Sequence, residues 1–288
     1  MKNILITGCS SGFGYNAAKF LADKGHHVYA TMRNVAGKNS APANELTDYS
    51  DNIEVVEIDV TNDASVNKGI KKIDQLDVLI NNAGLGYGGP LEAFTAQEVI
   101  DQLDLNIVGT FRMAKAVLPM MRKQGNGLII QVSSTAGRAA FPGFGVYHAS
   151  KWGLEGMSEA LRYELAPLGI EVVLVEPGPF DTNFFGNVVM PKDEEVAKAY
   201  GHVMEFQQGF GSQVQSMFED KDAPTDPQVV VDIFNELINM EPGTRPIRTV
   251  AGLDFGYREF NKATEKYRKD TLAFMNISEW DGPQKANK

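Results

Sequence analysis

Short apolar runs that alternate with helical patterns constrain the fold of this chain more than any other feature. Most runs are rich in β-branched residues and apolar nearly throughout, which is typical of strands covered on both faces of a parallel sheet. Helical patterns lie between most of them and indicate a doubly wound α/β sheet of about seven strands. The predicted strands are residues 3–7, 27–31, 53–58, 77–80, 128–132, 171–175 and 247–250. The predicted helices are residues 12–24, 63–73, 96–117, 148–166 and 227–240.

The length of 288 residues fits one α/β domain of ordinary size, and we predict a single domain over residues 1–288. Residues 182–227 contain helical patterns and no strand signal, although they lie between the last two predicted strands. Ligands of such sheets bind beyond the carboxyl ends of the strands, so we expect this insertion to cover a substrate. Residues 257–288 form a polar C-terminal extension with interspersed aromatic residues, and the sequence assigns it no role.

Composition restricts the partners that the chain can have. Its net charge is −10 and it has no block of basic residues, which argues against nucleic acid. No apolar run approaches the ~18 residues of a membrane span, and the N-terminal run is too short for a signal peptide. We therefore expect a cytoplasmic protein with no membrane partner. The four histidines lack metal-ligand spacing and the single cysteine, Cys9, cannot form an intramolecular disulfide, so no metal site is predicted.

A glycine-rich turn joins the first predicted strand to the first predicted helix. Glycines let the backbone turn tightly and approach a pyrophosphate, and the N–H groups at the helix start attract its negative charge. Taken alone, the glycines fit either a phosphate site or a tight turn without a ligand. The candidate phosphate-binding residues are Gly8, Ser10, Ser11, Gly12, Phe13 and Gly14.

The end of the second predicted strand indicates which dinucleotide would bind. An acidic residue at this point would bind the adenosine ribose of NAD, but the sequence there contains no acid and instead carries Arg33. A guanidinium can bind a 2′-phosphate, so NADP(H) is the predicted cofactor. The alternative is that Arg33 is an ordinary solvated charge.

Tyr147 and Lys151 stand four residues apart at the start of a predicted helix, which places them on one helical face. A free phenol has a pKa of ~10, and a neighbouring ammonium is expected to lower it toward the range of a useful acid or base. Tyr15 and Lys19 have the same spacing, but no serine-bearing strand precedes them, so a helix-surface pair is the expected role there.

Ser134 ends the fifth predicted strand, 13 residues before Tyr147. A hydroxyl at that edge of the sheet can hydrogen-bond a substrate carbonyl and its developing oxyanion. Ser133 is adjacent but points to the opposite side of the strand, and the count favours Ser134. His148 lies about 100° from Tyr147 on the helix and is predicted to be structural. Cys9 is predicted to be inert rather than a reactive thiol.

These motifs, in this order, resemble those of the short-chain dehydrogenase/reductase family in its single-domain Rossmann form, nearest the branch of 17β-hydroxysteroid and retinol dehydrogenases. The resemblance covers residues 1 to about 250 and includes a glycine motif of the type TGxxxGxG. It implies an enzyme that transfers a hydride between NADP(H) and a carbonyl or secondary alcohol. It implies a catalytic set of Asn106, Ser134, Tyr147 and Lys151, in which Asn106 supports a water that links Lys151 to solvent.

The resemblance also implies roles for residues at the ends of the other strands. Asp59 and Val60 are expected to contact adenine, and Phe180 and Thr182 to hold the nicotinamide carboxamide. Lys151 is expected to bind the nicotinamide ribose as well. The remaining cofactor residues implied by family motifs are Asn82, Ala83, Gly84, Pro177 and Gly178. Taken singly, these motifs fit a turn, a helix bend or a strand end equally well.

Large apolar residues dominate the loops expected around the nicotinamide, which favours a hydrophobic carbonyl or alcohol, although the same residues fit packing of the insertion. These residues are Phe141, Pro142, Phe144, Phe180, Phe184, Phe185, Val188 and Met190. Two other classes stay open: a catalytically inactive NADPH-sensing protein and a sugar-nucleotide epimerase or dehydratase relative. The resemblance further implies a homodimer or homotetramer.

Overall fold

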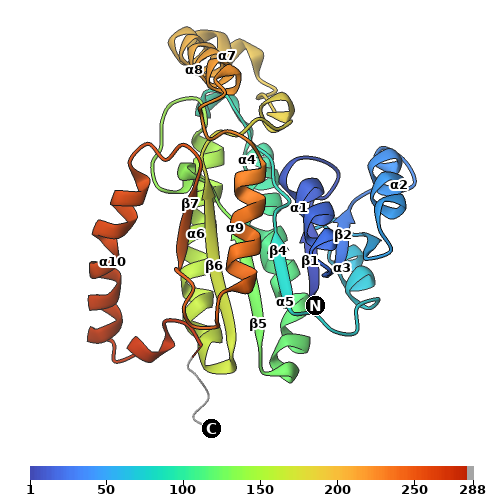
Figure 1. The fold of residues 1–288 in the computed structure, drawn as a ribbon. Helices are drawn as coiled ribbons and strands as arrows, with labels where there is room; N and C mark the ends of the chain where they lie inside the picture. The colour runs from blue at the N-terminus through green and yellow to red at the C-terminus, as the bar shows by residue number, and fades with distance from the viewer. Residues whose placement is uncertain (284–288) are drawn as a thin grey trace.

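The apolar runs form a seven-stranded sheet in which every described pairing is parallel, with the order β3-β2-β1-β4-β5-β6-β7 (Figure 1). The computed structural model describes residues 1–283. The strands are β1 Asn3–Thr7, β2 His27–Met32, β3 Ile53–Glu57, β4 Val78–Asn81, β5 Gly127–Val132, β6 Ile170–Pro177 and β7 Arg248–Ala251. The predicted Rossmann-like, doubly wound parallel sheet in a single domain is confirmed.

Two apolar layers cover the faces of the sheet. One layer joins α1 and α9 to the sheet, and the other joins α3 and α5 to it, while α6 packs along β6. The four residues of β4 and the eight of β6 are all buried, which explains why these strands are largely apolar. The helices are α1 Gly12–Asp23, α2 Ser40–Tyr49, α3 Asp63–Ile70, α4 Ala96–Leu103, α5 Gly109–Gln124, α6 Gly145–Leu165, α7 Glu194–Ala199, α8 Gly201–Glu219, α9 Gln228–Asn239 and α10 Tyr257–Phe274.

Two helical predictions need correction. The single helix predicted over 96–117 is divided into α4 and α5 by a π-helical segment, Asp104–Val108, which inserts an extra residue into the turn. Helix α2 was not predicted, because only Ala43 and Leu46 among its ten residues are buried and no apolar stripe marks it.

The insertion forms α7 and α8 and lies beyond the carboxyl ends of the strands (Figure 1). Backbone contacts fasten it to the loop after β4: the N–H of Gly88 donates to the carbonyl of Val189 at 3.0 Å, and Tyr87 forms a parallel bridge with Val189. The buried carboxylate of Glu98 both closes the N-terminus of α4 and accepts the N–H of Lys192 at 3.1 Å. The insertion is therefore anchored at its base and projects over the sheet edge.

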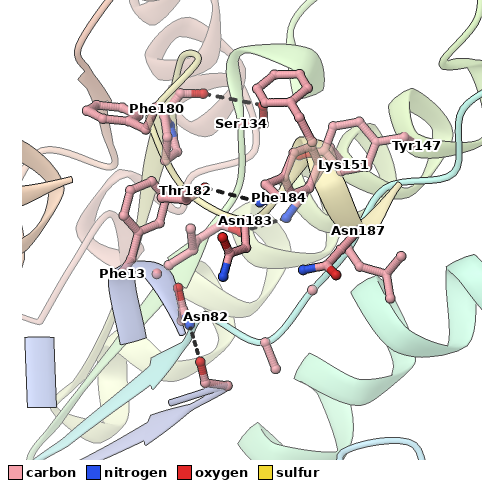
Figure 2. Close-up of a pocket in the computed structure, with 18 of the residues that line it drawn as sticks. Phe13, Asn82, Ser134, Tyr147, Lys151, Phe180, Thr182, Asn183, Phe184 and Asn187 are labelled. Atoms are coloured by element: carbon pink, nitrogen blue, oxygen red, sulfur yellow. Dashed lines mark hydrogen bonds between the residues drawn. The ribbon is translucent and has the colours of Figure 1, made fainter. Parts of the chain in front are cut away.

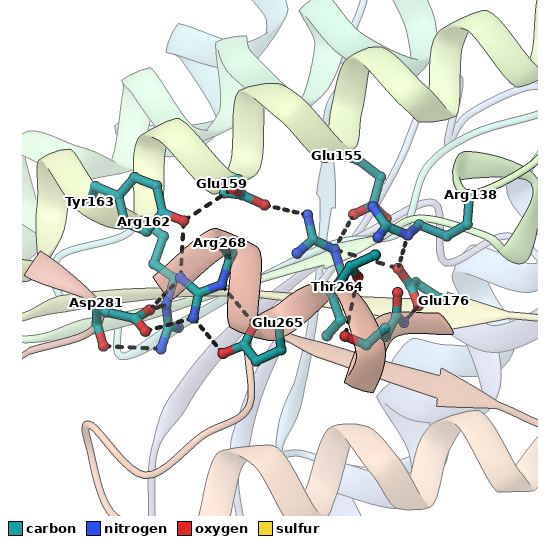
Figure 3. Close-up of polar contacts among 12 residues, drawn as sticks. Arg138, Glu155, Glu159, Arg162, Tyr163, Glu176, Thr264, Glu265, Arg268 and Asp281 are labelled. Atoms are coloured by element: carbon teal, nitrogen blue, oxygen red, sulfur yellow. Dashed lines mark hydrogen bonds and ion pairs between the residues drawn. The ribbon is translucent and has the colours of Figure 1, made fainter. Parts of the chain in front are cut away.

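The C-terminal extension forms α10, which ion pairs connect to α6 (Figure 3). Asp281 accepts Nε of Arg162 at 3.0 Å and Nη2 of Arg268 at 2.6 Å. Arg268 also donates to the hydroxyl of Tyr163 at 2.9 Å. Because Arg162 and Tyr163 belong to α6, the extension packs on the helix that begins beyond the carboxyl end of β5.

We predict that Asp281→Asn weakens this attachment. Burial acts to raise the pKa of Asp281, but hydrogen bonds and charge from Arg268 and Arg162 outweigh it and hold that pKa below its ordinary value of 3.8. A lowered carboxyl pKa stabilises the fold above the ordinary value, and the contribution is lost as the pH falls through the lowered one. Urea unfolding at neutral pH should show a loss of about 2 kcal/mol, which shrinks on acidification. Asp270→Asn, at an exposed position of α10, is the control and should change little.

Candidate functional site

A cavity of about 850 Å³ lies at the carboxyl ends of the central strands (Figure 2). It extends from the glycine loop after β1 to the start of α6 and the insertion, and Figure 2 shows Asn82 on one side and Tyr147 on the other. The cofactor residues predicted from sequence that line it are Gly8, Ser10, Ser11, Gly12, Phe13, Arg33, Asp59, Val60, Asn82, Ala83, Gly84, Tyr147, Lys151, Pro177, Gly178, Phe180 and Thr182.

The glycine loop is held against the loop that follows β4. Gly8 and Gly12 have φ of +75° and +60°, a region that favours glycine, and a Cβ on Gly8 would lie 2.8 Å from Cα of Ala83. Nδ2 of Asn82 donates to the carbonyls of Thr7 at 2.9 Å and Gly8 at 3.2 Å. The loop is thus fixed in a shape that only small residues permit.

The start of α1 fits a phosphate group. Ser11 precedes the helix in an extended conformation and makes no side-chain capping bond, and both Ser11 and Gly12 line the cavity. The first N–H groups of a helix are unpaired within it and carry a partial positive charge. A glycine cradle that a Cβ would fill, next to an uncapped helix start, therefore fits the pyrophosphate of a dinucleotide.

Gly14 does not contribute to the cavity wall in the way that its motif suggests. A Cβ there would lie 2.6 Å from Nδ2 of Asn82 and 2.6 Å from the carbonyl oxygen of Gly8. Gly14 therefore allows the two loops to approach, and a direct phosphate contact is not needed to explain this glycine.

Two exposed cations lie at the end of the cavity next to β2. Arg33 lines this end as predicted, and Lys38, which the sequence argument missed, lines it too. Nδ2 of Asn39 donates to the carbonyl of Arg33 at 2.6 Å and steadies the loop between the cations. Lys38 could have been found from the sequence, because it is a second cation only five residues after Arg33. Nearby, Asp59 accepts both the N–H and the hydroxyl of Thr61, at 3.0 and 2.7 Å.

Tyr147, Lys151 and Ser134 meet at the other end of the cavity, where β5 ends and α6 begins. Nζ of Lys151 lies 5.8 Å from the ring centroid of Tyr147 and donates to the carbonyl of Val132 at 2.8 Å. The hydroxyl of Ser134 donates to the carbonyl of Pro177 at 3.3 Å and accepts the N–H of Ala136 at 3.1 Å. The three side chains singled out by spacing are therefore brought together.

The predicted direction of the Tyr147 pKa is wrong for this structure. Burial raises that pKa to about 12, and a hydrogen bond with Ser134 opposes it only in part. Burial also lowers the pKa of Lys151 to about 8, while the charge of Glu155 acts against this decrease. Desolvation disfavours the charged form of each side chain and is the largest cause of both shifts in pKa. Tyr147 is consequently protonated at neutral pH, which is the form that can donate a proton.

Asn106 lies within the π-helical segment and behind the cavity rather than in its wall. Its Nδ2 donates to the carbonyl of Leu85 at 3.1 Å and to Oγ of Ser150 at 2.9 Å. Ser150 in turn donates to the carbonyl of Tyr147 at 2.7 Å. Because π-helical turns redirect side chains and are frequent at functional sites, this segment explains how Asn106 reaches α6.

His148 and Ser133 were also considered from the sequence, and both form hydrogen bonds with backbone groups. His148 is buried, with Nδ1 3.0 Å from the carbonyl of Ala136 and Nε2 accepting the N–H of Phe141 at 3.2 Å, so both ring nitrogens are engaged. Ser133 lines the cavity beside Ser134, and its N–H donates to the carbonyl of Val175 at 2.7 Å. The structural prediction for His148 is supported.

Cys9 and Tyr15 also behave as expected. Burial raises the pKa of the Cys9 thiol to about 12, so the reactive thiolate is absent at neutral pH. The hydroxyl of Tyr15 donates to Glu45 at 2.9 Å on the surface, away from Ser134. The second Tyr-x-x-x-Lys match therefore lies outside the cavity.

Aromatic residues form the outer part of the cavity, and several of them were not named as candidates from the sequence. The insertion contributes Phe206 and Phe210, four residues apart on α8, and the segment after β7 contributes Phe255 and Tyr257. The predicted apolar residues that line the cavity are Phe141, Phe144, Phe180, Phe184 and Phe185. Those that do not are Pro142, Val188 and Met190. The four-residue spacing of Phe206 and Phe210 predicts that they share one face of a helix. Which way that face points depends on how α8 packs, and the sequence does not show this.

The described residues, 1–283, contain no cluster of side chains suited to a metal ion. Within the same residues, no helix has the length and apolar character needed to cross a bilayer.

Comparisons with known proteins agree with this geometry. The short chain dehydrogenase family profile matches residues 2–193. The chain is 45% identical over 188 residues to 3-ketodihydrosphingosine reductase of Bacteroides thetaiotaomicron, which covers 64% of this chain and 66% of that protein. It is 35% identical over 238 residues to 17-beta-hydroxysteroid dehydrogenase type 1 of Homo sapiens, which covers 80% and 72%. It is 38% identical over 192 residues to retinol dehydrogenase 8 of Homo sapiens, which covers 65% and 62%.

Two solved structures resemble the fold over most of its length. A short-chain dehydrogenase from Streptomyces avermitilis has a TM-score of 0.71 and 30% identity, with coverage of 94% of this chain and 100% of that one. A short chain dehydrogenase from Burkholderia cenocepacia in complex with NADP has a TM-score of 0.68 and 26% identity, with coverage of 94% and 96%.

The chain therefore belongs to the short-chain dehydrogenase/reductase family of oxidoreductases. Among its relatives it is similar to the branch that contains the hydroxysteroid, retinol and ketodihydrosphingosine enzymes.

We predict that Gly14→Ala disturbs the contact between the two loops. The added Cβ would overlap Asn82 and the Gly8 carbonyl, and such overpacking costs about 1–3 kcal/mol. Chemical unfolding should show this loss. Gly209→Ala in α8 is the matched control, because nothing lies within 4 Å of its added Cβ and alanine favours a helix. Equal stability of Gly14→Ala and the wild type would contradict the role given to this glycine.

Proposed function

We propose that the protein is an NADP(H)-dependent oxidoreductase that transfers a hydride between the cofactor and a carbonyl or secondary alcohol. The observation that carries this proposal is the meeting of Ser134, Tyr147 and Lys151 in one cavity with the glycine cradle. One part of the cavity suits a dinucleotide phosphate, and the other presents a buried phenol and hydroxyl to a reacting oxygen.

The cofactor would be held by groups from several strand ends. Gly8, Ser10, Ser11, Gly12 and Phe13 would surround the pyrophosphate, and Arg33 would bind a 2′-phosphate. When bound, the cofactor supplies or accepts the hydride. Residues proposed for its other parts are Asp59, Val60, Asn82, Ala83, Gly84, Tyr147, Lys151, Pro177, Gly178, Phe180 and Thr182.

Tyr147 would act as the acid during reduction. Its hydroxyl is protonated at neutral pH because burial raises its pKa, so it can give that proton to the substrate oxygen. Ser134 lies close enough to hydrogen-bond Tyr147 and would stabilise the charge that develops on the same oxygen. Asn106 would fix the start of α6 through Ser150. In oxidation the same phenol would receive the proton.

The substrate is proposed to be hydrophobic. Phe144, Phe184, Phe206 and Phe210 present apolar surface to the outer part of the cavity, and such surface favours apolar ligands. The relatives are named for a ketodihydrosphingosine, a hydroxysteroid and retinol, all of which carry much hydrocarbon. The insertion at about 182–227 would cover this ligand.

The two other classes are less well supported. Ser134, Tyr147 and Lys151 together favour an enzyme over an inactive NADPH-sensing protein, because sensing requires no acid beside the substrate. Residues 1–283 form one sheet with its covering helices and include no large second domain of the kind expected for a sugar-nucleotide epimerase or dehydratase. We further propose that residues 1–288 form one NADP(H)-binding domain. We also propose that the protein is cytoplasmic and assembles as a homodimer or homotetramer.

Cofactor preference is tested with Arg33→Ala. A charge-assisted hydrogen bond to phosphate contributes roughly 1.5–3 kcal/mol, so the variant should lose about ten- to a hundredfold in NADPH affinity and little in NADH affinity. Fluorescence titration with both cofactors measures this, and Lys38→Ala should give a smaller loss of the same kind. Wild-type protein that binds NADH as tightly as NADPH would refute the assignment.

The mechanism is tested with Tyr147→Phe, which keeps the ring and removes the proton. Turnover measured by NADPH absorbance with a panel of hydrophobic ketones should fall by ~10² or more, while NADPH binding stays nearly intact. Full activity of this variant on a confirmed substrate would falsify the proposed mechanism.

Matched variants sharpen this test. Tyr15→Phe changes the other Tyr-x-x-x-Lys match and should leave turnover normal. Ser134→Ala should lower turnover, whereas Ser133→Ala should be mild. Lys151→Ala should weaken both turnover and NADPH binding, because the ammonium is proposed to serve both.

A further inference from the structure

Lys151 carries its amino group into a buried place. The residue is 7% exposed, and Nζ donates to the Val132 carbonyl at the end of β5. The titratable groups that act on it come from its own helix: Tyr147 one turn before, and Glu155 one turn after. An ammonium in such surroundings tends to lose its proton, since burial disfavours the charged form.

Glu155 is fixed by an arginine from the edge strand. Its side chain is buried, and Oε2 accepts Nε of Arg248 at 2.8 Å. Nη2 of Arg248 donates to Glu159 at 2.6 Å, so the guanidinium spans two successive turns of α6. The carboxylate of Glu155 is therefore held one helical turn from Lys151 rather than free to leave it.

Gly137 makes room for this arrangement. A Cβ on Gly137 would lie 3.0 Å from Cγ of Glu155 and 3.3 Å from the carbonyl oxygen of Lys151. A larger residue would push Glu155 away from the turn that carries Lys151. The loop after Ser134 and the helix α6 are thus shaped around Glu155.

A second buried carboxyl, Glu176 at the end of β6, faces the same arginine. Its Oε1 lies 3.6 Å from Nε of Arg248 and 3.7 Å from Nε of Arg138, and Oε2 accepts Nδ2 of Asn261. Burial and the charge of Glu155 raise the pKa of Glu176. Glu176 therefore gains a proton readily, and once it is neutral the charge of Arg248 is balanced by Glu155 and Glu159.

Resting on the function proposed above, we propose that Glu155 is a positioning residue whose carboxylate, held by Arg248, keeps the buried Lys151 ammonium charged beside Tyr147. Two observations support it. Glu155 is buried one helical turn after Lys151, where side chains four residues apart are neighbours, and its charge opposes the effect of burial on Lys151. Glu159 pairs with the same arginine but lies a full turn farther along α6, so the two carboxylates separate an electrostatic role from a structural one.

The test compares Glu155→Gln with Glu159→Gln in cofactor-free protein. Lysine labelled with ¹³C at Cε is followed by NMR over pH, and the Lys151 signal is identified by its loss in Lys151→Arg. Removing the negative charge destabilises the ammonium, so the Lys151 midpoint in Glu155→Gln should fall by roughly one pH unit. Glu159→Gln should leave it unchanged. No shift in the first variant, or an equal shift in both, overturns the proposal.

A further variant covers the case in which Glu155→Gln fails to fold. Glu155→Asp keeps the charge but shortens the side chain, so stability should fall while the Lys151 midpoint stays within about half a pH unit of the wild type. A full-unit displacement despite the retained charge overturns the electrostatic role.

Activity separates this proposal from the proposed function. On a confirmed substrate, the alkaline limb of the kcat profile should move to lower pH in Glu155→Gln by the same amount as the NMR midpoint. A shifted midpoint together with no turnover on any carbonyl or alcohol would refute the reaction and leave the role of Glu155 standing. A shifted midpoint with an unmoved alkaline limb would refute the link between Lys151 and catalysis.

Discussion

The contact between the loops that follow β1 and β4 holds the rest of the site in place. A parallel sheet brings the carboxyl ends of its central strands to one edge, but it leaves the loops there free to vary. Here Asn82 bonds the carbonyls of Thr7 and Gly8, and Gly8 approaches Ala83 too closely for a side chain. This contact sets the start of α1 at a constant distance from β4 and β5, and hence from Ser134. A long dinucleotide requires such a fixed separation between its phosphate site and its reacting end.

Sequence reasoning succeeded where a residue and its surroundings are linked by local geometry. β4 and β6 are buried along their whole length, so their apolar runs identify them as strands without further information. Tyr147 and Lys151 share a face because a helix has a constant period. It failed where tertiary packing determines whether a segment is helical and how its turns are wound. α2 buries only two side chains, and the π-helical turn at Asn106 satisfies contacts with α6 that the sequence does not display.

Charge was the hardest property to predict. Whether the pKa of Tyr147 is raised or lowered depends on how much water reaches the phenol. The closeness of Lys151 to Tyr147 in the sequence carries no information about that burial. Glu155 was not predicted to matter either. Its partner Arg248 lies on β7, 93 residues away along the chain, and the sequence does not show that the two meet. Lys38 was accessible to sequence reasoning, since it shares a short loop with Arg33, whereas Phe255 became part of the cavity only through the turn after β7.

The ion pairs between α6 and Asp281 have a consequence for how the protein is made. Arg162 lies on the helix that carries Tyr147 and Lys151, yet its partner follows it by 119 residues. During synthesis the chain emerges from its N-terminus, so α6 can pack on the sheet long before Asp281 is available. Until then the partners of Arg162 are the carbonyls of Val172 and Arg245 and the carboxylate of Glu171. The helix that carries Tyr147 and Lys151 therefore gains these contacts only after synthesis has reached Asp281.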